Sequence, residues 1–299
     1  MAAIHGPKSG GLIGETMLVS LKEVLRKARA GGYAVPAFDI TEDLLIRPIL
    51  DACEAARSPV ILMALEHDLG GRGFDYIASI VRGAAPAYSI PIVLHLDHST
   101  DFAMIQKAIA YGFTSVMYDG SALCFEENAA ASRRVADYAH GKGVDVEAEL
   151  GKVAGKDLDG RDGGESLLTD PREVVEFLAL TGVDALAVSI GTAHGVYAST
   201  PNLDIELMKA ICAVSSVPLV LHGGSGTPTS QIRAAIKNGI AKVNLYSDIR
   251  AALFRGLKEA VAVETRSDPP PDALFAPAKA VVMAAVRDKI AMVQSEGRA

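Results

Sequence analysis

The sequence contains few of the residues that mark secreted, disulfide-bonded or membrane-spanning proteins. Its 299 residues include no tryptophan and only three cysteines, Cys53, Cys124 and Cys212, which lie far apart without paired spacing. No apolar run reaches the roughly 18 residues of a membrane-spanning helix, and the Gly-rich start of the chain lacks the apolar segment of a secretory signal. We therefore expect a cytoplasmic protein with no membrane partner, in which residues 1–16 form a flexible N-terminus.

The charge balance argues against a nucleic-acid partner. Lys and Arg number 29 against 36 Asp and Glu, which gives a net charge of −7, and no basic run is present. Apolar residues make up 49% of the chain, and a chain of this length buries a large core without disulfides. No linker divides the sequence, since its richest proline cluster, Pro269–Pro271, falls late. We expect residues 1–299 to form one domain.

Short runs rich in Val, Ile and Leu recur along the chain, and most are continuously apolar. Such runs are typical of parallel strands that are covered on both faces. The predicted strands are Tyr33–Phe38, Pro59–Leu65, Pro91–Leu96, Ser115–Tyr118, Val144–Leu150, Ala185–Ile190, Val217–Leu221 and Lys242–Leu245.

Helical patterns lie between these runs. The predicted helices include Ser20–Ala30, Glu42–Ala56, Asp101–Ala110, Glu126–His140, Pro171–Leu180, Asp204–Val214, Ser230–Asn238 and a C-terminal helix at 278–294. Alternating strands and helices predict an α/β fold, and eight strands favour a closed (β/α)8 TIM barrel. The alternative, an open doubly wound sheet, usually carries G-x-G-x-x-G after its first strand, but Asp39 to Glu42 read DITE.

Three of the seven histidines fall where predicted strands end. In a β/α barrel the active site lies at the carboxyl ends of the strands, so His98, His194 and His222 should converge there. One such histidine would more often be structural, but three at separate strand ends suggest a metal site. Three imidazoles suit zinc and leave the open fourth position that catalysis requires.

Carboxylates accompany these histidines. Asp97 precedes His98 and is placed to move protons on a metal-bound substrate, although it could instead orient an imidazole. Asp119 and Glu149 could orient the metal ligands or hold a further cation. The alternative for these two is salt bridging at the rim of the barrel.

A glycine-rich segment follows the seventh predicted strand. His222 is followed by Gly223, Gly224, Ser225 and Gly226, and a helix is expected to begin near Thr229. Glycines let backbone N–H groups approach an anion closely, and barrel phosphate sites commonly follow strands seven and eight. The position of the segment therefore favours a phosphate site over a simple flexible turn.

Several motifs together resemble the class II, zinc-dependent fructose- and tagatose-bisphosphate aldolases. The similarity spans nearly the whole chain in order. The matching segments are Tyr33–Phe38 (YAVPAF), Val93–His98 (VLHLDH), Gly112–Ser121 (GFTSVMYDGS), Val146–Gly151 (VEAELG), Thr181–Tyr197 (TGVDALAVSIGTAHGVY), Pro218–Gly226 (PLVLHGGSG) and Gly239–Ser247 (GIAKVNLYS).

The resemblance implies roles for these residues. The three histidines would bind Zn2+, with a monovalent cation as a further candidate, and Asp97 would handle the C4 hydroxyl proton of a ketose (bis)phosphate. Asp119 and Glu149 would hold an accessory metal ion or orient the histidine ligands. The positions that would bind the product dihydroxyacetone phosphate are Gly195, Gly223, Gly224, Ser225, Asn244, Tyr246 and Ser247.

Four positions depart from the family pattern. Asp39 replaces the usual Asn, Leu65 stands where a Ser usually meets the second phosphate, and Asp272 falls near a late Arg that reaches the same phosphate across a subunit contact. Tyr246 fills a position that is usually small or acidic. These changes predict weaker binding of a second phosphate, and hence a preference for a ketose 1-phosphate that releases an unphosphorylated aldehyde.

Two other classes of function remain open at this level. A metal-dependent hydrolase would usually carry an H-x-H pair on its first strand, and this chain has none there. A sugar-phosphate-binding barrel without catalysis would not need Asp97. The resemblance also implies a homodimer or homotetramer, with the C-terminal helix as a candidate contact.

Overall fold

A closed barrel of eight parallel strands forms the centre of the protein. The computed structural model describes residues 18–155, 166–195 and 201–299. The strands close in the order β1-β10-β9-β7-β5-β4-β3-β2. Their bounds are β1 (Val35–Asp39), β2 (Val60–Leu65), β3 (Ile92–Ser99), β4 (Ser115–Tyr118), β5 (Asp145–Leu150), β7 (Ala185–Val188), β9 (Leu219–Leu221) and β10 (Ile240–Leu245). The predicted (β/α)8 barrel is therefore confirmed.

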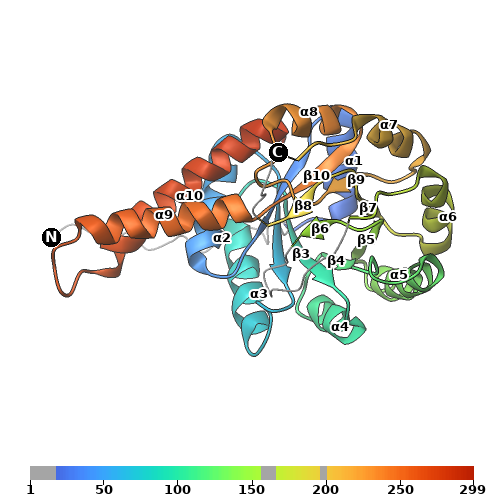
Figure 1. Ribbon diagram of the computed structural model, residues 1–299. Helices are drawn as coiled ribbons and strands as arrows, with labels where there is room; N and C mark the ends of the chain where they lie inside the picture. The colour runs from blue at the N-terminus through green and yellow to red at the C-terminus, as the bar shows by residue number, and fades with distance from the viewer. Residues whose placement is uncertain (1–17, 156–165, 196–200) are drawn as a thin grey trace.

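Helices surround the barrel (Figure 1). They are α1 (Leu21–Gly31), α2 (Asp43–Ala56), α3 (Gly73–Ala84), α4 (Phe102–Ala110), α5 (Phe125–His140), α6 (Pro171–Thr181), α7 (Ile205–Val214), α8 (Thr229–Lys237), α9 (Ser247–Val263) and α10 (Pro271–Val293), with a 3-10 turn η1 (Ala85–Ala87). Side chains of Ser20, Asp101, Asp170 and Asp204 accept hydrogen bonds from the first-turn N–H groups of α1, α4, α6 and α7. These caps satisfy donors that a helix cannot satisfy internally.

The structure differs from the prediction at the C-terminal helix and adds elements that the prediction did not name. The C-terminal helix was expected at 278–294, but α10 begins at Pro271, because proline at the first helical position loses no hydrogen bond. Pro277 lies inside the same helix. The helices α3 and α9 were absent from the prediction. A short second sheet also pairs β6 (Ala154–Gly155) with β8 (Ala193–His194).

Helix α1 closes the amino-terminal end of the barrel. Its buried face joins inward-pointing strand residues in one apolar cluster, which contains Leu21, Val24, Leu25, Ala28, Val35, Ala37, Ile61, Met63, Val93, Ala185, Ala187 and Val220. A larger apolar cluster fills the layer between the strands and the outer helices. Because this end of the barrel interior is apolar and sealed, polar groups inside the barrel gather toward the opposite end. Among the described residues, no helix is both long and apolar enough to cross a membrane.

Candidate active site

Alternation along the strands directs a set of polar side chains into the barrel. In a strand, every second side chain points to the same face. Val35 and Ala37 point inward, so Asp39 also does, and Val93 is followed in the same way by His95 and Asp97. The polar members of these rows lie at the carboxyl ends of the strands, which is the functional end of such barrels.

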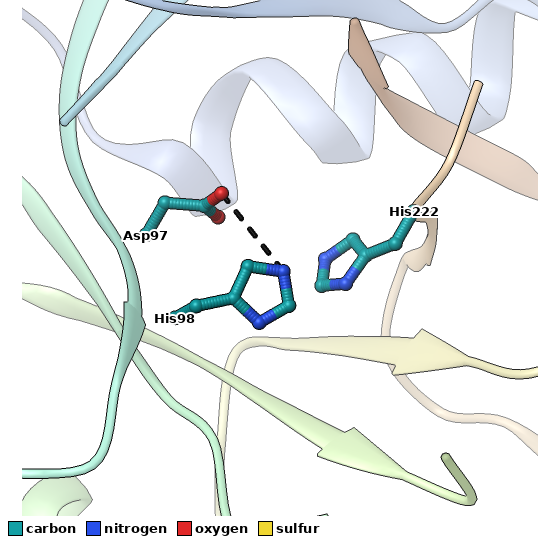
Figure 2. Close-up of side chains that lie close together, drawn as sticks. All are labelled: Asp97, His98 and His222. Carbon is teal, nitrogen blue, oxygen red and sulfur yellow. Dashed lines mark ion pairs between the residues drawn. The ribbon is translucent and has the colours of Figure 1, made fainter. Parts of the chain in front are cut away.

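A backbone irregularity brings Asp97 and His98 to the same site. Consecutive strand residues normally point to opposite faces, but His98 has a φ of 47°, and the pairing of β3 with β4 shifts between Leu96 and Ser99. A positive φ is unusual for a residue other than glycine, and such conformations gather at functional sites. The turn places His98 Nε2 4.0 Å from Asp97 Oδ2, the ion pair drawn in Figure 2.

Carboxylates orient the two imidazoles. The Nδ1 atom of His98 lies 2.8 Å from Asp119 Oδ2, which leaves Nε2 facing Asp97. His222 places Nε2 3.0 Å from Glu147 Oε1 and Nδ1 3.0 Å from Glu149 Oε2. The ring centroids of His98 and His222 lie 4.5 Å apart, and the rings pack edge to face. Figure 2 shows the two rings side by side. Paired carboxylates of this kind fix the tautomer and rotation of metal-binding histidines.

A buried lysine forms an ion pair with Glu147, the carboxylate beside His222. The Nζ atom of Lys242 lies 2.8 Å from Glu147 Oε2, and both side chains are fully buried. Burial alone would raise the pKa of Glu147, but Lys242 and the neighbouring imidazoles hold it well below its ordinary value. Glu147 is therefore a carboxylate that can accept from His222 Nε2–H, while Nδ1 of His222 faces Glu149.

Two groups of side chains could hold a metal ion. Asp97, His98 and His222 form one, and His98, Asp119 and Glu149 form the other, with the ligand atoms of each group within 4.8 Å of one another. Imidazole and carboxylate are suitable zinc ligands, so the described residues fit the ion. The third predicted ligand, His194, lies on β8, which pairs with Gly155 on β6. The position of its side chain lies outside the described residues.

Asp97 lies in a strongly polar setting. Its oxygens are 3.3 and 3.4 Å from Asn244 Nδ2. Burial disfavours the charged form, but His98, Lys242 and His222 offset it, so the pKa of Asp97 lies below its ordinary value. Asp97 is therefore a carboxylate at neutral pH and can accept a proton.

The glycine-rich loop lies beside the end of β10 and the start of α9. The hydroxyl of Ser225 accepts hydrogen bonds from the N–H groups of Tyr246 and Asp248, and Gly224 N–H donates to the carbonyl of Asn244. A Cβ on Gly224 would lie 2.4 Å from a methyl of Val243, so only glycine fits there. The predicted residue Ser247 is the first of α9. Together these groups join a glycine loop to a helix N-terminus, which favours an anion.

Gly195 follows β8 with a φ of 87°, which glycine adopts without strain. The sequence reasoning gave no role to three residues near the site, the buried His95 and Lys242 and the partly buried Asp68. His95 Nδ1 lies 2.7 Å from Ser115 Oγ, and burial with the charge of Lys242 lowers its pKa to about 3. The sequence pattern could have revealed His95 and Lys242, since each lies two residues before a predicted site residue on the same strand. Asp68 lies in a loop, where no such periodicity applies.

Comparisons with known proteins identify the family of the chain. A family model described as fructose-bisphosphate aldolase class-II matches residues 19–298. The YdjI aldolase of Escherichia coli K12 is 33% identical over 94% of this chain and 99% of its own, with a TM-score of 0.84. A putative fructose-1,6-biphosphate aldolase of Coccidioides immitis is 30% identical over 93% of this chain and 97% of its own, with a TM-score of 0.82.

A third structure, fructose-bisphosphate aldolase of Campylobacter jejuni, is 23% identical over 94% of this chain and 97% of its own, with a TM-score of 0.81, and shows the shared fold. The chain belongs to the class II fructose-bisphosphate aldolase family. It is therefore an aldolase, an enzyme of the lyase class, and the family supports ketose-phosphate aldolase activity with a metal ion.

Proposed function

We propose that this enzyme is a zinc-dependent aldolase that reversibly cleaves a ketose phosphate into dihydroxyacetone phosphate and an aldehyde. The observation that carries the proposal is the convergence of the His98 and His222 imidazoles beside the Asp97 carboxylate, with ligand atoms within 4.8 Å. His194 is proposed as the third zinc ligand from its position at the end of β8. A bound Zn2+ would act as a Lewis acid on the ketone carbonyl of the substrate.

The side chains of the site supply the proton chemistry. In cleavage, Asp97 takes the proton of the C4 hydroxyl, the C3–C4 bond breaks, and the aldehyde leaves with C4 as its carbonyl carbon. The electron pair of the broken bond stays on C3 of the phosphate-bearing half, which then takes up a proton. Asn244, 3.3 Å from Asp97, holds the carboxylate in place. In condensation, Asp97 returns the proton to the new C4 oxygen.

The loop after β9 is the proposed phosphate site. The loop residues Gly223 and Gly224, the hydroxyl of Ser225 and the first turn of α9 at Ser247 lie close together at one side of the rim. Gly195 would contribute a backbone N–H from the opposite strand end. Binding the phosphate there would bring the ketone toward His98 and His222. Phosphate commonly binds at this corner of β/α barrels.

Two positions at which the family usually binds the second phosphate carry unsuitable residues in this chain, Leu65 and Asp272. Leu65 ends β2 and pairs in register with Asp97, so an apolar side chain lies at the inner face there. Asp272 lies in the first turn of α10, after the 17 residues of α9 lead about 25 Å away from the rim. We infer a preference for a ketose 1-phosphate over a bisphosphate, with an aldehyde lacking phosphate as the second product.

A coupled assay for dihydroxyacetone phosphate tests the proposal. Purified enzyme is offered fructose 1-phosphate, fructose 1,6-bisphosphate and tagatose 1,6-bisphosphate, before and after removal of metal by a chelator. We expect release of dihydroxyacetone phosphate, its loss in the chelated enzyme, and its return on adding Zn2+. Release that survives complete removal of metal would overturn the zinc proposal. Hydrolysis of phosphate without triose phosphate would overturn the aldolase proposal.

The arm formed by α9 and α10 extends from the barrel (Figure 1). It exposes large apolar side chains, including Phe254, Val261, Val263 and Phe275. Because exposed apolar groups of this size often mark protein interfaces, we propose that the arm joins copies of the chain into a homodimer or homotetramer.

Cys53, Cys124 and Cys212 are all free thiols, which supports the proposed cytoplasmic location.

A further inference from the structure

One carboxyl oxygen of Asp39, Oδ1, is buried at the barrel mouth without a hydrogen-bond partner among the described residues. Asp39 ends β1 and points inward in the same row as Val35 and Ala37. The residue is only 4% exposed, and within the described part of the chain its buried Oδ1 accepts no hydrogen bond. A buried acceptor left without a donor costs free energy, so such an atom in an active site marks a place for a ligand donor.

Asp68 follows β2 and Tyr246 follows β10, the two strands that pair with β1. Burial raises the pKa of Asp39, and the charges of Asp97 and Asp68 raise it further. Burial also raises the pKa of Tyr246, and the charges of Asp39 and Asp68 add to that effect. Asp68 Oδ1 lies 3.2 Å from His67 Nε2, whereas the buried Oδ2 has no hydrogen-bond partner in the described part of the protein. The mouth therefore contains two buried carboxyl oxygens that have no hydrogen-bond partner among the described residues.

Asp39 and Asp68 belong to neither candidate metal group. Both groups of three described residues whose ligand atoms lie within 4.8 Å of one another contain His98, and neither contains Asp39 or Asp68. Their unpartnered oxygens instead match hydroxyl groups, such as those of a polyol. Leu65, which ends the neighbouring strand β2, has an apolar side chain and supplies no donor.

The charges at the mouth also discriminate against an anionic acceptor. Lys242, the buried cation nearby, is already paired with Glu147. Arg250 is exposed, and its guanidinium lies 5.2 Å from the ring centroid of Tyr246. Among the described residues, a phosphate at this mouth would therefore meet the carboxylates of Asp68 and Asp97, with Arg250 turned to solvent. Like charges in a poorly solvated site repel, so the terminal group of the acceptor should be neutral.

We propose that Asp39, assisted by Asp68, is a specificity-determining residue that accepts hydrogen bonds from hydroxyls of the acceptor aldehyde. The substrate class is then a ketose 1-phosphate whose aldehyde half is polyhydroxylated and carries no phosphate. This inference rests on the proposed aldolase function. It assigns to the acid at position 39 a task that differs from binding a second phosphate.

The test measures condensation of dihydroxyacetone phosphate with three acceptors: glyceraldehyde, propanal and glyceraldehyde 3-phosphate. Propanal has the same carbon chain as glyceraldehyde but lacks its hydroxyls. For the wild-type enzyme we expect kcat/KM to be highest with glyceraldehyde. In Asp39→Ala the ratio of kcat/KM for glyceraldehyde to that for propanal should fall about 5- to 100-fold, as expected when a buried hydrogen-bond partner of the hydroxyls is removed.

The ratio separates recognition from damage to the fold or the metal site, because such damage lowers the rates with both acceptors together. Asp137→Asn, which changes an exposed carboxylate on α5, is the matched control. Bound zinc and thermal unfolding of each variant are measured alongside. An unchanged glyceraldehyde-to-propanal ratio in Asp39→Ala overturns the inference. Absence of condensation with all three acceptors in the wild-type enzyme instead overturns the proposed function.

Discussion

At the scale of single residues, the buried pair of Lys242 and Glu147 connects the closed interior of the barrel to the metal site. Glu147 contacts His222 through one oxygen and Lys242 through the other, at 3.0 and 2.8 Å. Such a pair seldom adds net stability, because both charges lose their hydration, but removing one partner leaves the other charge uncompensated. The benefit of the pair is then positional, since it keeps an acceptor opposite His222.

Glu147→Gln tests this function of the pair. The amide retains an oxygen for His222 Nε2–H but leaves Lys242 without a counter-charge, so we expect unfolding free energy to fall by about 3–5 kcal/mol and zinc affinity by about 10- to 100-fold. Urea unfolding and competition with a chromophoric chelator measure the two effects. The double variant with Lys242→Met removes the buried charge and should recover much of the lost stability. If the single variant binds zinc as tightly as the wild type, the positional role is wrong.

Asp97 is the second residue whose role can be separated from folding. Asp97→Asn keeps the shape of the side chain and can still contact Asn244, but it cannot accept the hydroxyl proton. We expect kcat for cleavage to fall about 10²- to 10⁴-fold, with bound zinc, measured by elemental analysis, close to one equivalent. Loss of the metal in this variant would show that Asp97 acts chiefly as a ligand.

At the scale of elements, the loop between β9 and α8 is packed so closely that its conformation is fixed. Gly224 faces Val243 and the carbonyl of Asn244, which a Cβ would approach to 2.4 and 2.8 Å. Gly224→Ala should therefore displace the loop and raise KM for the phosphorylated substrate about 10-fold or more, as expected for losing hydrogen bonds to a charged group. Steady-state kinetics measure this change, and Gly83→Ala, where a Cβ meets nothing within 4 Å, is the control. An unchanged KM would place the phosphate elsewhere.

Asp184 joins elements at the closed end of the barrel and gives stability a dependence on pH. Its carboxylate lies 2.7 Å from both Lys22 Nζ and His140 Nε2 and accepts from Val146 N–H at 3.0 Å. Burial opposes the charge, but these partners hold the pKa of Asp184 below its ordinary value of 3.8. A carboxyl with a lowered folded pKa stabilises the protein above 3.8, and this contribution disappears as the pH falls through the folded pKa.

Asp184→Asn should thus lower unfolding free energy at pH 7 by about 1–3 kcal/mol. The difference from the wild type should shrink at acid pH, once the native carboxyl is itself protonated. Chemical denaturation of both proteins between pH 7 and the lowest pH at which they stay folded measures the difference. A gap that widens on acidification contradicts the assigned direction.

At the scale of the whole molecule, periodicity accounts for most of what the sequence revealed. Continuous apolar runs identify the eight strands, and the strand ends identify the rim where His98 and His222 meet. The left-handed turn at His98 was not foreseeable, because a non-glycine residue rarely adopts a φ of 47° and no sequence pattern marks it. The loop residue Asp68 was missed for a similar reason, since its position depends on tertiary contacts.

The paired helices α9 and α10 were harder to predict as an arm, because α9 follows the last barrel strand directly and α10 begins inside a proline cluster. The sequence pattern of neither helix indicates that the helix extends away from the barrel. The exposed apolar side chains indicate an interface only once the structure shows that the helices project from the barrel (Figure 1).

The proposed assembly through this arm can be tested at Phe254, which is 70% exposed. A buried charge without a partner is costly in an interface, so Phe254→Asp should shift a dimer or tetramer toward smaller species, with a change in apparent dissociation constant of about 10-fold or more. Light scattering coupled to size-exclusion chromatography, over a range of protein concentrations, measures the mass directly. Tyr76→Asp is the control, because Tyr76 is similarly exposed, at 64%, but lies on α3. A wild-type protein that remains monomeric at all concentrations, or a Phe254 variant with unchanged mass, would show that the arm has another purpose.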